Sequence, residues 1–229
     1  MSSFSDNLQE VNERIAGAAH RAGRSPDEVT LVAVTKNVEA ERAAGAVAAG
    51  IVDIGENRVQ EAQAKAPCMP PDTRWHLVGH LQRNKARHVV GMFSMVHSLD
   101  SLELGAELDR RCAASGVNLD VLIQVNMARE PQKFGVHPEA AKELLMAVSR
   151  FENLRVMGMM VMAPLAPTPE ASRQWFRQGR ELAEELQRLR LANVRLEHLS
   201  MGMSGDFEVA IEEGATMVRI GSALFGPRQ

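Results

Sequence analysis

The run LVAVTK, residues 31–36, decides how the rest of this sequence is interpreted. Its first four residues are apolar and two of them are β-branched, which predicts a short buried strand. The run ends in Lys36, and a charge-poor helical pattern follows from Val38 to Ala49. A lysine at the end of a buried strand is costly unless it has a partner or a chemical role, because desolvation favours the neutral amine that attacks carbonyls and forms Schiff bases. The alternative at this point is that Lys36 reaches solvent, as most charged residues near strand ends do.

The alternation of a strand pattern and a helical pattern continues along the chain. Strands are predicted at residues 31–36, 51–54, 75–78, 95–97, 119–125, 154–160, 194–199 and 216–220. Helices are predicted at residues 6–22, 38–49, 58–65, 82–90, 102–112, 138–149 and 207–213, together with a long helix that Thr168 caps. Alternating strands and helices indicate a parallel α/β sheet, and eight strands favour a closed TIM barrel, (β/α)8, over an open doubly wound sheet. The open sheet is the alternative, since the strand at 95–97 is short.

We expect a single barrel domain over residues 1–229, because no break in the pattern is long enough to be a linker. An additional helix at about residues 6–22 precedes the first strand. Asp6 is predicted to be its N-cap, with Gln9 three residues further on.

Composition limits the functional classes. Of the 229 residues, 45% are hydrophobic and 24% are charged, as in ordinary globular proteins. The net charge of -3 argues against a nucleic-acid-binding surface. Cys68 and Cys112 form no CxxC pair, the first residues lack the layout of a signal peptide, and no apolar run approaches the ~20 residues that cross a bilayer. We therefore expect a cytoplasmic protein with no nucleic-acid or membrane partner.

In a TIM barrel, functional residues are expected where the strands end, because the loops at the carboxyl ends form the active site. The residues at the predicted ends are Lys36, Asn57, His80, Asn126, Met160, Ser200 and Gly221.

The loops after the last two strands have the composition of an anion site. The run SMGMSG occupies residues 200–205, and Gly221-Ser222 follows the eighth strand. Glycines let backbone N–H groups approach an anion, serines add donors, and many barrels bind phosphate with these two loops. The alternative is a pair of ordinary turns, with Asp206 as the cap of the next helix. No GxxxxGK[ST] or GxGxxG motif supports a nucleoside triphosphate or a dinucleotide.

Arg219 lies inside the eighth predicted strand, between Val218 and Ile220, which must face the other way. An arginine that points into a barrel needs an acceptor, and a ligand ring is one candidate. The alternative is an ion pair with an acid of another strand, such as Asp53 or Glu197.

The histidines do not support a metal site. His76 and His80 are four residues apart, which on a strand is about 13 Å, too far for one shared ion. We expect them to be packed or hydrogen-bonded. The methionines of the sixth strand are expected to pack in the core.

Together these segments resemble the pyridoxal phosphate homeostasis proteins, the YggS/PROSC family. The matching segments are VAVTK (32–36), GENRVQE (55–61), WHLVGHLQRNK (75–85), KFG (133–135), MGMM (157–160), LSMGMS (199–204) and MVRIG (217–221). They occur in the family's order over nearly the whole chain. Small departures are Thr35, where relatives often have serine, and Gly205, where they often have a polar residue.

The resemblance implies a single barrel like the amino-terminal domain of alanine racemases, with pyridoxal 5'-phosphate (PLP) bound to Lys36 as an internal aldimine. It implies that Arg219 faces the pyridine nitrogen and that Asn57 lines the pocket. The implied phosphate-binding residues are Ser200, Met201, Gly202, Met203, Ser204, Gly221 and Ser222.

An arginine at the ring nitrogen keeps that nitrogen unprotonated and weakens PLP as an electron sink. Alanine racemases also use a tyrosine from a second domain, and this chain has no tyrosine. We therefore expect a monomeric, non-catalytic carrier that buffers PLP and passes it to apo-enzymes, the delivery step being implied by the resemblance alone. The alternatives are a weak racemase or lyase acting on small amino acids, in which a histidine replaces the tyrosine, and a phosphate-binding barrel without PLP.

Overall fold

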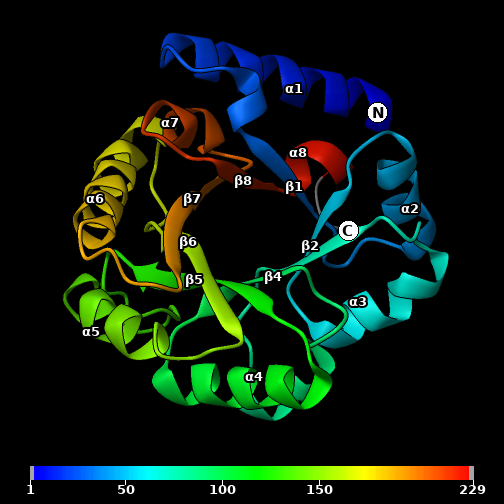
Figure 1. Cartoon of the computed structure of the whole chain (residues 1–229). Helices are drawn as coiled ribbons and strands as arrows, with labels where there is room; N and C mark the ends of the chain where they lie inside the picture. The colour runs from blue at the N-terminus through cyan, green and yellow to red at the C-terminus, as the bar shows by residue number, and fades with distance from the viewer. Residues whose placement is uncertain (1–2, 227–229) are drawn as a thin grey trace.

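The chain folds into a closed barrel of parallel strands (Figure 1). The computed structural model describes residues 3–226, so the outermost residues of the predicted domain, 1–2 and 227–229, lie outside the described part. The strands are β1 (Thr30–Val34), β2 (Asp53–Glu56), β3 (Arg74–Leu77), β4 (Met95–Leu99), β5 (Leu119–Asn126), β6 (Leu154–Met162), β7 (Val194–Met203) and β8 (Met217–Ile220). They pair in chain order, and β1 pairs with β8. The predicted TIM barrel is confirmed and the open sheet is excluded.

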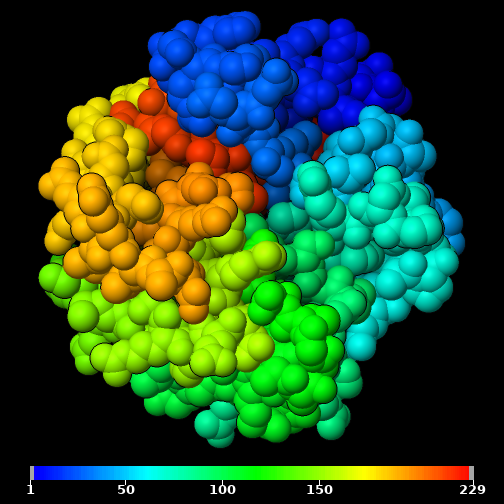
Figure 2. All heavy atoms as spheres, viewed as in Figure 1, coloured from blue at the N-terminus to red at the C-terminus, as the bar shows by residue number. Residues whose placement is uncertain are grey.

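Helices form a ring around the strands, and α1 lies outside this ring against α7 and α8 (Figure 1). The helices are α1 (Phe4–Arg21), α2 (Ala40–Ala48), α3 (Val59–Lys65), α4 (Leu102–Ser115), α5 (Pro138–Val148), α6 (Pro169–Gln187), α7 (Phe207–Glu212) and α8 (Ser222–Phe225), with 3-10 helices η1 (Pro26–Glu28), η2 (Ala66–Cys68) and η3 (Arg83–His88). The segments follow one another around the rim in sequence order, so that the first and last meet (Figure 2). Within residues 3–226, none of the helices is long and apolar enough to cross a membrane.

The first helix begins earlier than predicted. The Ser3 hydroxyl accepts a hydrogen bond from the Asp6 N–H at 3.1 Å, and the Asp6 carboxylate accepts one from the Ser3 N–H at 2.9 Å. This reciprocal pair is a capping box, so the N-cap is Ser3 and the prediction of Asp6 was wrong. Thr168 caps α6 as predicted, because its hydroxyl accepts from the Ala171 N–H at 3.4 Å. The segment predicted as a helix at 82–90 is the shorter 3-10 helix η3.

Strand β7 continues further than predicted, and this moves the first half of the expected anion loop into the sheet. The strand ends at Met203, not near residue 199. An irregularity in its pairing with β8 lies between Ser200 and Met203, and Gly202 has a φ of 87°. A Cβ at Gly202 would lie 2.6 Å from the Cβ of Ala210, so only glycine fits between β7 and α7.

The strands have apolar residues on both faces. Their outer face packs against the helices in one large cluster, while Met95, Leu122, Met160 and Met217 form a second cluster. Side chains alternate between the two faces of a strand, and these four lie on the inner face. The second cluster therefore packs inside the barrel. The predicted packing role of the β6 methionines is confirmed: Met159 packs in the first cluster and Met160 in the second.

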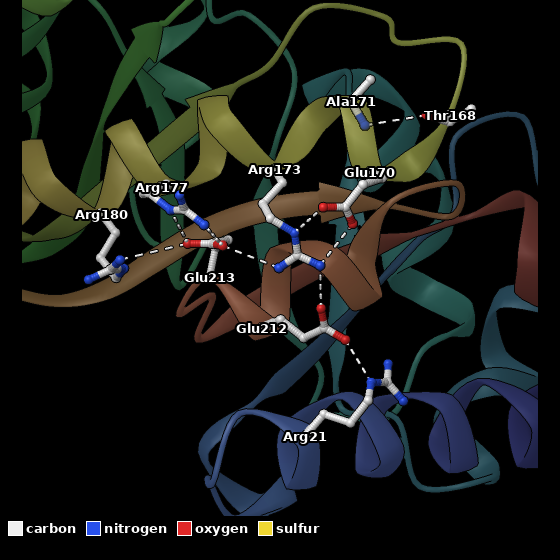
Figure 3. Close-up of polar contacts among 9 residues, drawn as sticks. All are labelled: Arg21, Thr168, Glu170, Ala171, Arg173, Arg177, Arg180, Glu212 and Glu213. Carbon is white, nitrogen blue, oxygen red and sulfur yellow. Dashed lines mark hydrogen bonds and ion pairs between the residues drawn. The ribbon is translucent and has the colours of Figure 1, made fainter.

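An ion-pair network joins α1, α6 and α7 on the outside of the barrel (Figure 3). Glu213, directly after α7, is 6% exposed and lies 3.2 Å from Arg173 and 2.9 Å from Arg177 of α6. Glu212 lies 2.6 Å from Arg173 and 2.7 Å from Arg21 in the last turn of α1. These ion pairs therefore join the additional amino-terminal helix to α7 and, through Glu212, to α6.

Candidate functional site

Four strands that follow one another around the barrel carry the predicted site residues near their carboxyl ends. Lys36 lies just beyond β1, Asn57 follows β2, Ser204 follows β7 and Gly221 follows β8. Because β7, β8, β1 and β2 are successive neighbours, the closed barrel brings these residues to one sector of its mouth. A Cβ at Gly221 would lie 3.1 Å from the Val34 carbonyl oxygen, so the loop after β8 lies directly against the end of β1.

Lys36 lies in a tight turn rather than at the end of the strand itself. The carbonyl of Thr35 accepts a hydrogen bond from the Val38 N–H at 2.9 Å, which closes the turn. Asn37 has a φ of 59°, a left-handed conformation that asparagine adopts more readily than most residues. The Asn37 N–H donates to the Glu61 carboxylate of α3 at 3.2 Å. Lys36 is half-buried, and these two hydrogen bonds fix the turn that carries it.

A buried ion pair beneath this turn was not predicted from the sequence. Lys65 of α3 places its Nζ 2.5 Å from Glu56 Oε1 and 2.6 Å from the Thr35 carbonyl oxygen. The Thr35 hydroxyl donates to the same Glu56 oxygen at 2.6 Å. Burial raises the pKa of Glu56, although the hydrogen bonds from Lys65 and Thr35 act in the opposite direction. Lys65 thus ties α3 to the residue that precedes Lys36.

The loops after β7 and β8 lie together, as the sequence predicted. The Ser204 hydroxyl accepts hydrogen bonds from the Gly221 N–H at 3.3 Å and the Ala223 N–H at 3.2 Å. Asp206 is at the N-cap position of α7, but its carboxylate accepts from the Met203 N–H at 2.7 Å instead of capping the helix. This correction means that Asp206 fixes the shape of the β7 loop. Ser222 is exposed beside this group of donors.

Arg219 is buried in the barrel interior at the same sector. Its Nη1 donates to the Ser200 carbonyl oxygen at 2.7 Å and to the Ser200 hydroxyl at 2.8 Å. Its Nη2 has weaker acceptors, the Val161 carbonyl oxygen at 3.4 Å and the Met162 sulfur at 3.9 Å. Burial lowers the pKa of Arg219 to about 10, so the guanidinium is still charged at neutral pH. Among residues 3–226 it has no ion pair, and the alternative of a bridge to Asp53 or Glu197 is not observed.

Asp53 has other partners. Arg74 donates to both of its carboxylate oxygens, at 2.8 and 2.5 Å, and His76 Nε2 lies 2.8 Å from Oδ1. The second nitrogen of His76 lies 2.9 Å from His97 Nε2, and His97 Nδ1 lies 3.0 Å from the Ser200 hydroxyl. His76 is therefore hydrogen-bonded, as predicted, but within a chain of polar residues that reaches Arg219.

His97 was missed by the sequence reasoning. A signal was present: Asp53, His76 and His97 are polar residues on the inward parity of their strands, where a barrel normally places apolar side chains. The sequence shows the parity of each strand, but it does not show which inward residues meet.

The other strand ends do not belong to this cluster. Asn126 uses its amide to hold its own loop, donating to the carbonyls of Glu130 at 2.8 Å and Lys133 at 3.1 Å. Met160 packs in the barrel core. His80 lies 3.3 Å from the Asp100 carboxylate and stacks on Phe134 with ring centroids 3.7 Å apart. In the described part of the chain, no group of three or more His, Cys, Asp or Glu residues is arranged to hold a metal ion.

Comparison with known proteins shows the family to which the chain belongs. The family described as "Alanine racemase, N-terminal domain" matches residues 7–229. The pyridoxal phosphate homeostasis protein of Aquifex aeolicus is 44% identical over 225 residues, which are 98% of this chain and 98% of that protein. The chain belongs to the pyridoxal phosphate homeostasis protein family. The resemblance inferred from the sequence motifs is thereby confirmed.

Solved structures agree with this membership. PipY of Synechococcus elongatus, whose structure was determined with PLP bound, is 40% identical and superimposes with a TM-score of 0.82 over 94% of this chain and 100% of that one. An alanine racemase of Clostridium difficile gives a TM-score of 0.71 at 15% identity, covering 97% of this chain and 56% of the racemase. The second likeness shows the shared barrel fold alone.

Proposed function

We propose that this protein binds PLP as a Schiff base on Lys36, buffers the free cofactor and delivers it to apo-enzymes without substantial turnover. The observation that carries the proposal is Arg219, a buried cation on the strand next to β1. Within residues 3–226 its hydrogen-bond acceptors are all neutral. Val32 lies opposite Arg219 across the β1–β8 pair, and Lys36 lies in the turn just beyond the carboxyl end of β1.

The residues fit the three polar parts of the cofactor. An amine suits the aldehyde, a donor-only guanidinium suits an unprotonated ring nitrogen, and backbone N–H groups with serine hydroxyls suit the phosphate. Glycine is required at position 202, where a Cβ would lie 2.6 Å from Ala210, and it fits best at position 221, where a Cβ would lie 3.1 Å from the Val34 carbonyl oxygen. We assign the phosphate to the backbone of residues 201–204 together with Gly221 and Ser222, and the lining of the pocket to Asn57. The Ser200 hydroxyl, held between His97 and Arg219, acts through Arg219 instead of through the phosphate.

Two features support a carrier rather than an enzyme. When bound, PLP supplies an electron sink for amino-acid chemistry, and that sink is strongest when the ring nitrogen is protonated. Arg219 carries no acceptor and keeps its protons at neutral pH, so it favours the unprotonated nitrogen. The sequence also contains no tyrosine to serve as the second base of a racemase. We further propose that the protein works as a cytoplasmic monomer whose recipients are apo forms of PLP-dependent enzymes.

Borohydride reduction followed by peptide mass mapping tests the proposal. The purified protein incubated with PLP should carry a pyridoxyl group on Lys36 after reduction and none without it. Lys36→Ala should abolish this adduct, while Lys142→Ala, which replaces an exposed lysine of α5, should leave it unchanged. An unmodified Lys36 after incubation and reduction would refute the proposal and leave a phosphate-binding barrel. Reactivation of an apo-enzyme in proportion to the PLP loaded would then test delivery.

A second candidate function, a weak racemase or lyase for small amino acids, has one observation in its favour. His80, after β3, forms a pair with Asp100, after β4, at the mouth of the barrel, and such a pair is a possible base. Exchange of the α-proton of an amino acid in deuterated water distinguishes the two functions. The carrier predicts no exchange above free PLP, whereas exchange that His80→Gln and Lys36→Ala both abolish would establish an enzyme.

A further inference from the structure

A continuous chain of hydrogen bonds crosses the barrel interior. It starts at Asp53 on β2, passes through His76 on β3 and His97 on β4, and reaches Ser200 on β7 and Arg219 on β8. The four links measure 2.8, 2.9, 3.0 and 2.8 Å, in that order. All five residues are buried, with at most 7% of any of them exposed. Three of these residues lie on the consecutive strands β2, β3 and β4, and the closed barrel brings them to Ser200 and Arg219 on β7 and β8.

The chemistry of the two ends, together with the protonation of the two histidines, decides the direction of the hydrogen bonds between them. Burial works against the charge of Asp53, but the hydrogen bonds from His76 and Arg74 outweigh it and hold the pKa of Asp53 below its usual value, so this end is a carboxylate that only accepts. The other end, Arg219, only donates. With both histidines neutral, each group between the ends accepts from the Arg219 side and donates toward Asp53.

We propose that Asp53, His76, His97 and Ser200 act as positioning residues that fix the Arg219 guanidinium through a one-directional chain of hydrogen bonds. In this chain the Nε2–H of His76 donates to Asp53, and the Nε2–H of His97 donates to Nδ1 of His76. The hydroxyl of Ser200 donates to Nδ1 of His97, and Arg219 donates to the Ser200 oxygen. Both histidines are neutral and both carry their proton on Nε2.

The surroundings of His97 favour the neutral form. Burial lowers the pKa of His97 well below its ordinary value, and the positive charge of the neighbouring Arg219 acts in the same direction. If His76 were doubly protonated, His97 would have to donate to Ser200, whose hydroxyl hydrogen would then lose the acceptor it has in the one-directional chain. The neutral arrangement satisfies every donor and acceptor of the chain, as buried polar groups require.

The hydrogen-bond chain fixes the orientation of the Arg219 guanidinium. Ser200 takes both N–H groups of Nη1 with its carbonyl and hydroxyl oxygens, which fixes the plane of the guanidinium. Nη2 is left with long contacts and is the nitrogen available to a ligand. A donor fixed in advance costs less to immobilise on binding. This step rests on the proposed function, because it takes the ligand to be the PLP ring nitrogen.

The direction of the chain is measurable without PLP. Long-range proton–nitrogen correlation spectra of the imidazoles in the PLP-free protein, assigned with single histidine substitutions, report the tautomer of each ring. We expect neutral His76 and His97 at pH 7, both protonated on Nε2. A proton on Nδ1 of either ring, or an imidazolium at either position, would overturn the assignment. This result does not depend on whether the protein binds PLP, so it separates this inference from the proposed function.

The positioning role is tested by two substitutions and their controls. Ser200→Ala and His97→Phe should weaken PLP binding about three- to tenfold, the usual effect of having to immobilise one long side chain on binding. They should also change the pH profile of the absorption spectrum of the bound cofactor, which senses the ring nitrogen. His97→Asn keeps an acceptor near the Nδ1 position and should restore most of the affinity.

Ser98→Ala is the matched control. Ser98 lies beside His97 on β4, is fully buried, and its hydroxyl has no hydrogen-bond partner in the described part of the chain. Removing it should change neither the affinity nor the spectrum. Folded Ser200→Ala protein with parental affinity and an unchanged pH profile would overturn the positioning role, and so would Ser98→Ala protein as weak as Ser200→Ala. Ser200→Ala removes a single oxygen, so the test stands even if His97→Phe does not fold.

Discussion

Replacing Lys65 by methionine should destabilise the protein in a strongly pH-dependent way. Methionine has nearly the length of lysine but no charge, and it leaves Glu56 in place beneath the turn that carries Lys36. Glu56 is fully buried, and it would lose the ammonium group at 2.5 Å and keep only the Thr35 hydroxyl at 2.6 Å. Its other oxygen, Oε2, already lacks a hydrogen-bond partner within residues 3–226. A buried carboxylate with so little support takes up a proton.

The free energy needed to keep Glu56 protonated sets the size of the loss in stability. At 1.36 kcal/mol per pH unit, keeping a carboxyl with an ordinary pKa of 4.5 protonated costs about 3.4 kcal/mol at pH 7 and about 0.7 kcal/mol at pH 5. The value at pH 7 agrees with the roughly 3–5 kcal/mol lost when one partner of a buried ion pair is removed. In the variant, the folded state binds a proton that the unfolded state releases above pH 4.5, so the free energy of unfolding falls as the pH rises.

Urea denaturation of the parent and Lys65→Met proteins at pH 5 and pH 7 measures the difference. The loss in the free energy of unfolding should be about 3 kcal/mol at pH 7 and below about 1 kcal/mol at pH 5. Adding Glu56→Gln removes the titrating group and should abolish the pH dependence. Lys142→Met, the same change at an exposed helical position, should cost less than about 0.5 kcal/mol at both pH values. A small loss of equal size at pH 5 and pH 7 would show that Glu56 is solvated and would refute the reasoning.

Three further predictions concern other parts of the fold. Glu213→Gln should lower the free energy of unfolding by about 1.5–3 kcal/mol at pH 7. Hydrogen bonds from two arginines of α6 outweigh burial and hold the pKa of Glu213 below its usual value, so the deficit should disappear in acid titrations as the pH falls through that lowered pKa. Gly179→Ala should lower the free energy of unfolding by about 1–3 kcal/mol in thermal denaturation, because its Cβ would lie 2.7 Å from a valine of β6. A Cβ at Gly45 of α2 would meet nothing within 4 Å, so Gly45→Ala should raise the free energy of unfolding by about 0.5–1 kcal/mol. A thiol reagent should label Cys68 but not Cys112 in the native protein, because burial shields Cys112 and raises its pKa to about 11; rapid labelling of both would contradict this.

The barrel could be predicted from the sequence because strand and helix patterns are local. The short pattern at 95–97 is a real strand, Met95–Leu99, and its detection decided the count of eight. Boundaries were less accurate where apolar residues pack outside a strand. Ile51 is buried but precedes β2, which runs from Asp53 to Glu56, so the pattern placed this strand about two residues early. Burial and strand geometry are separate properties, and a pattern of apolar residues reports the first.

The candidate site was predicted only as far as single residues reveal it. A lysine at a strand end and glycines with serines in two late loops are visible in sequence. The contacts of these residues depend on the register of strands far apart in the chain. Ser200 illustrates the limit, because the sequence placed it in a loop, whereas the structure places it within β7, hydrogen-bonded to His97 and Arg219. Lys65 was missed for the same reason, since only the fold brings it to Glu56 and Thr35.

The distribution of buried charge indicates what the site is built to hold. Glu56 faces Lys65, and Asp53 faces Arg74 and His76, so these buried acids have basic partners. Arg219 differs, because its hydrogen-bond acceptors within residues 3–226 are carbonyls, a hydroxyl and a thioether. A carboxylate partner would neutralise the guanidinium, whereas neutral acceptors leave its charge available to an electron-rich ligand atom. The same guanidinium has no lone pair with which to hold a proton for that atom. Under the proposed function, a site organised around it would favour binding of a reactive cofactor over activation of that cofactor, which is the property that a carrier requires.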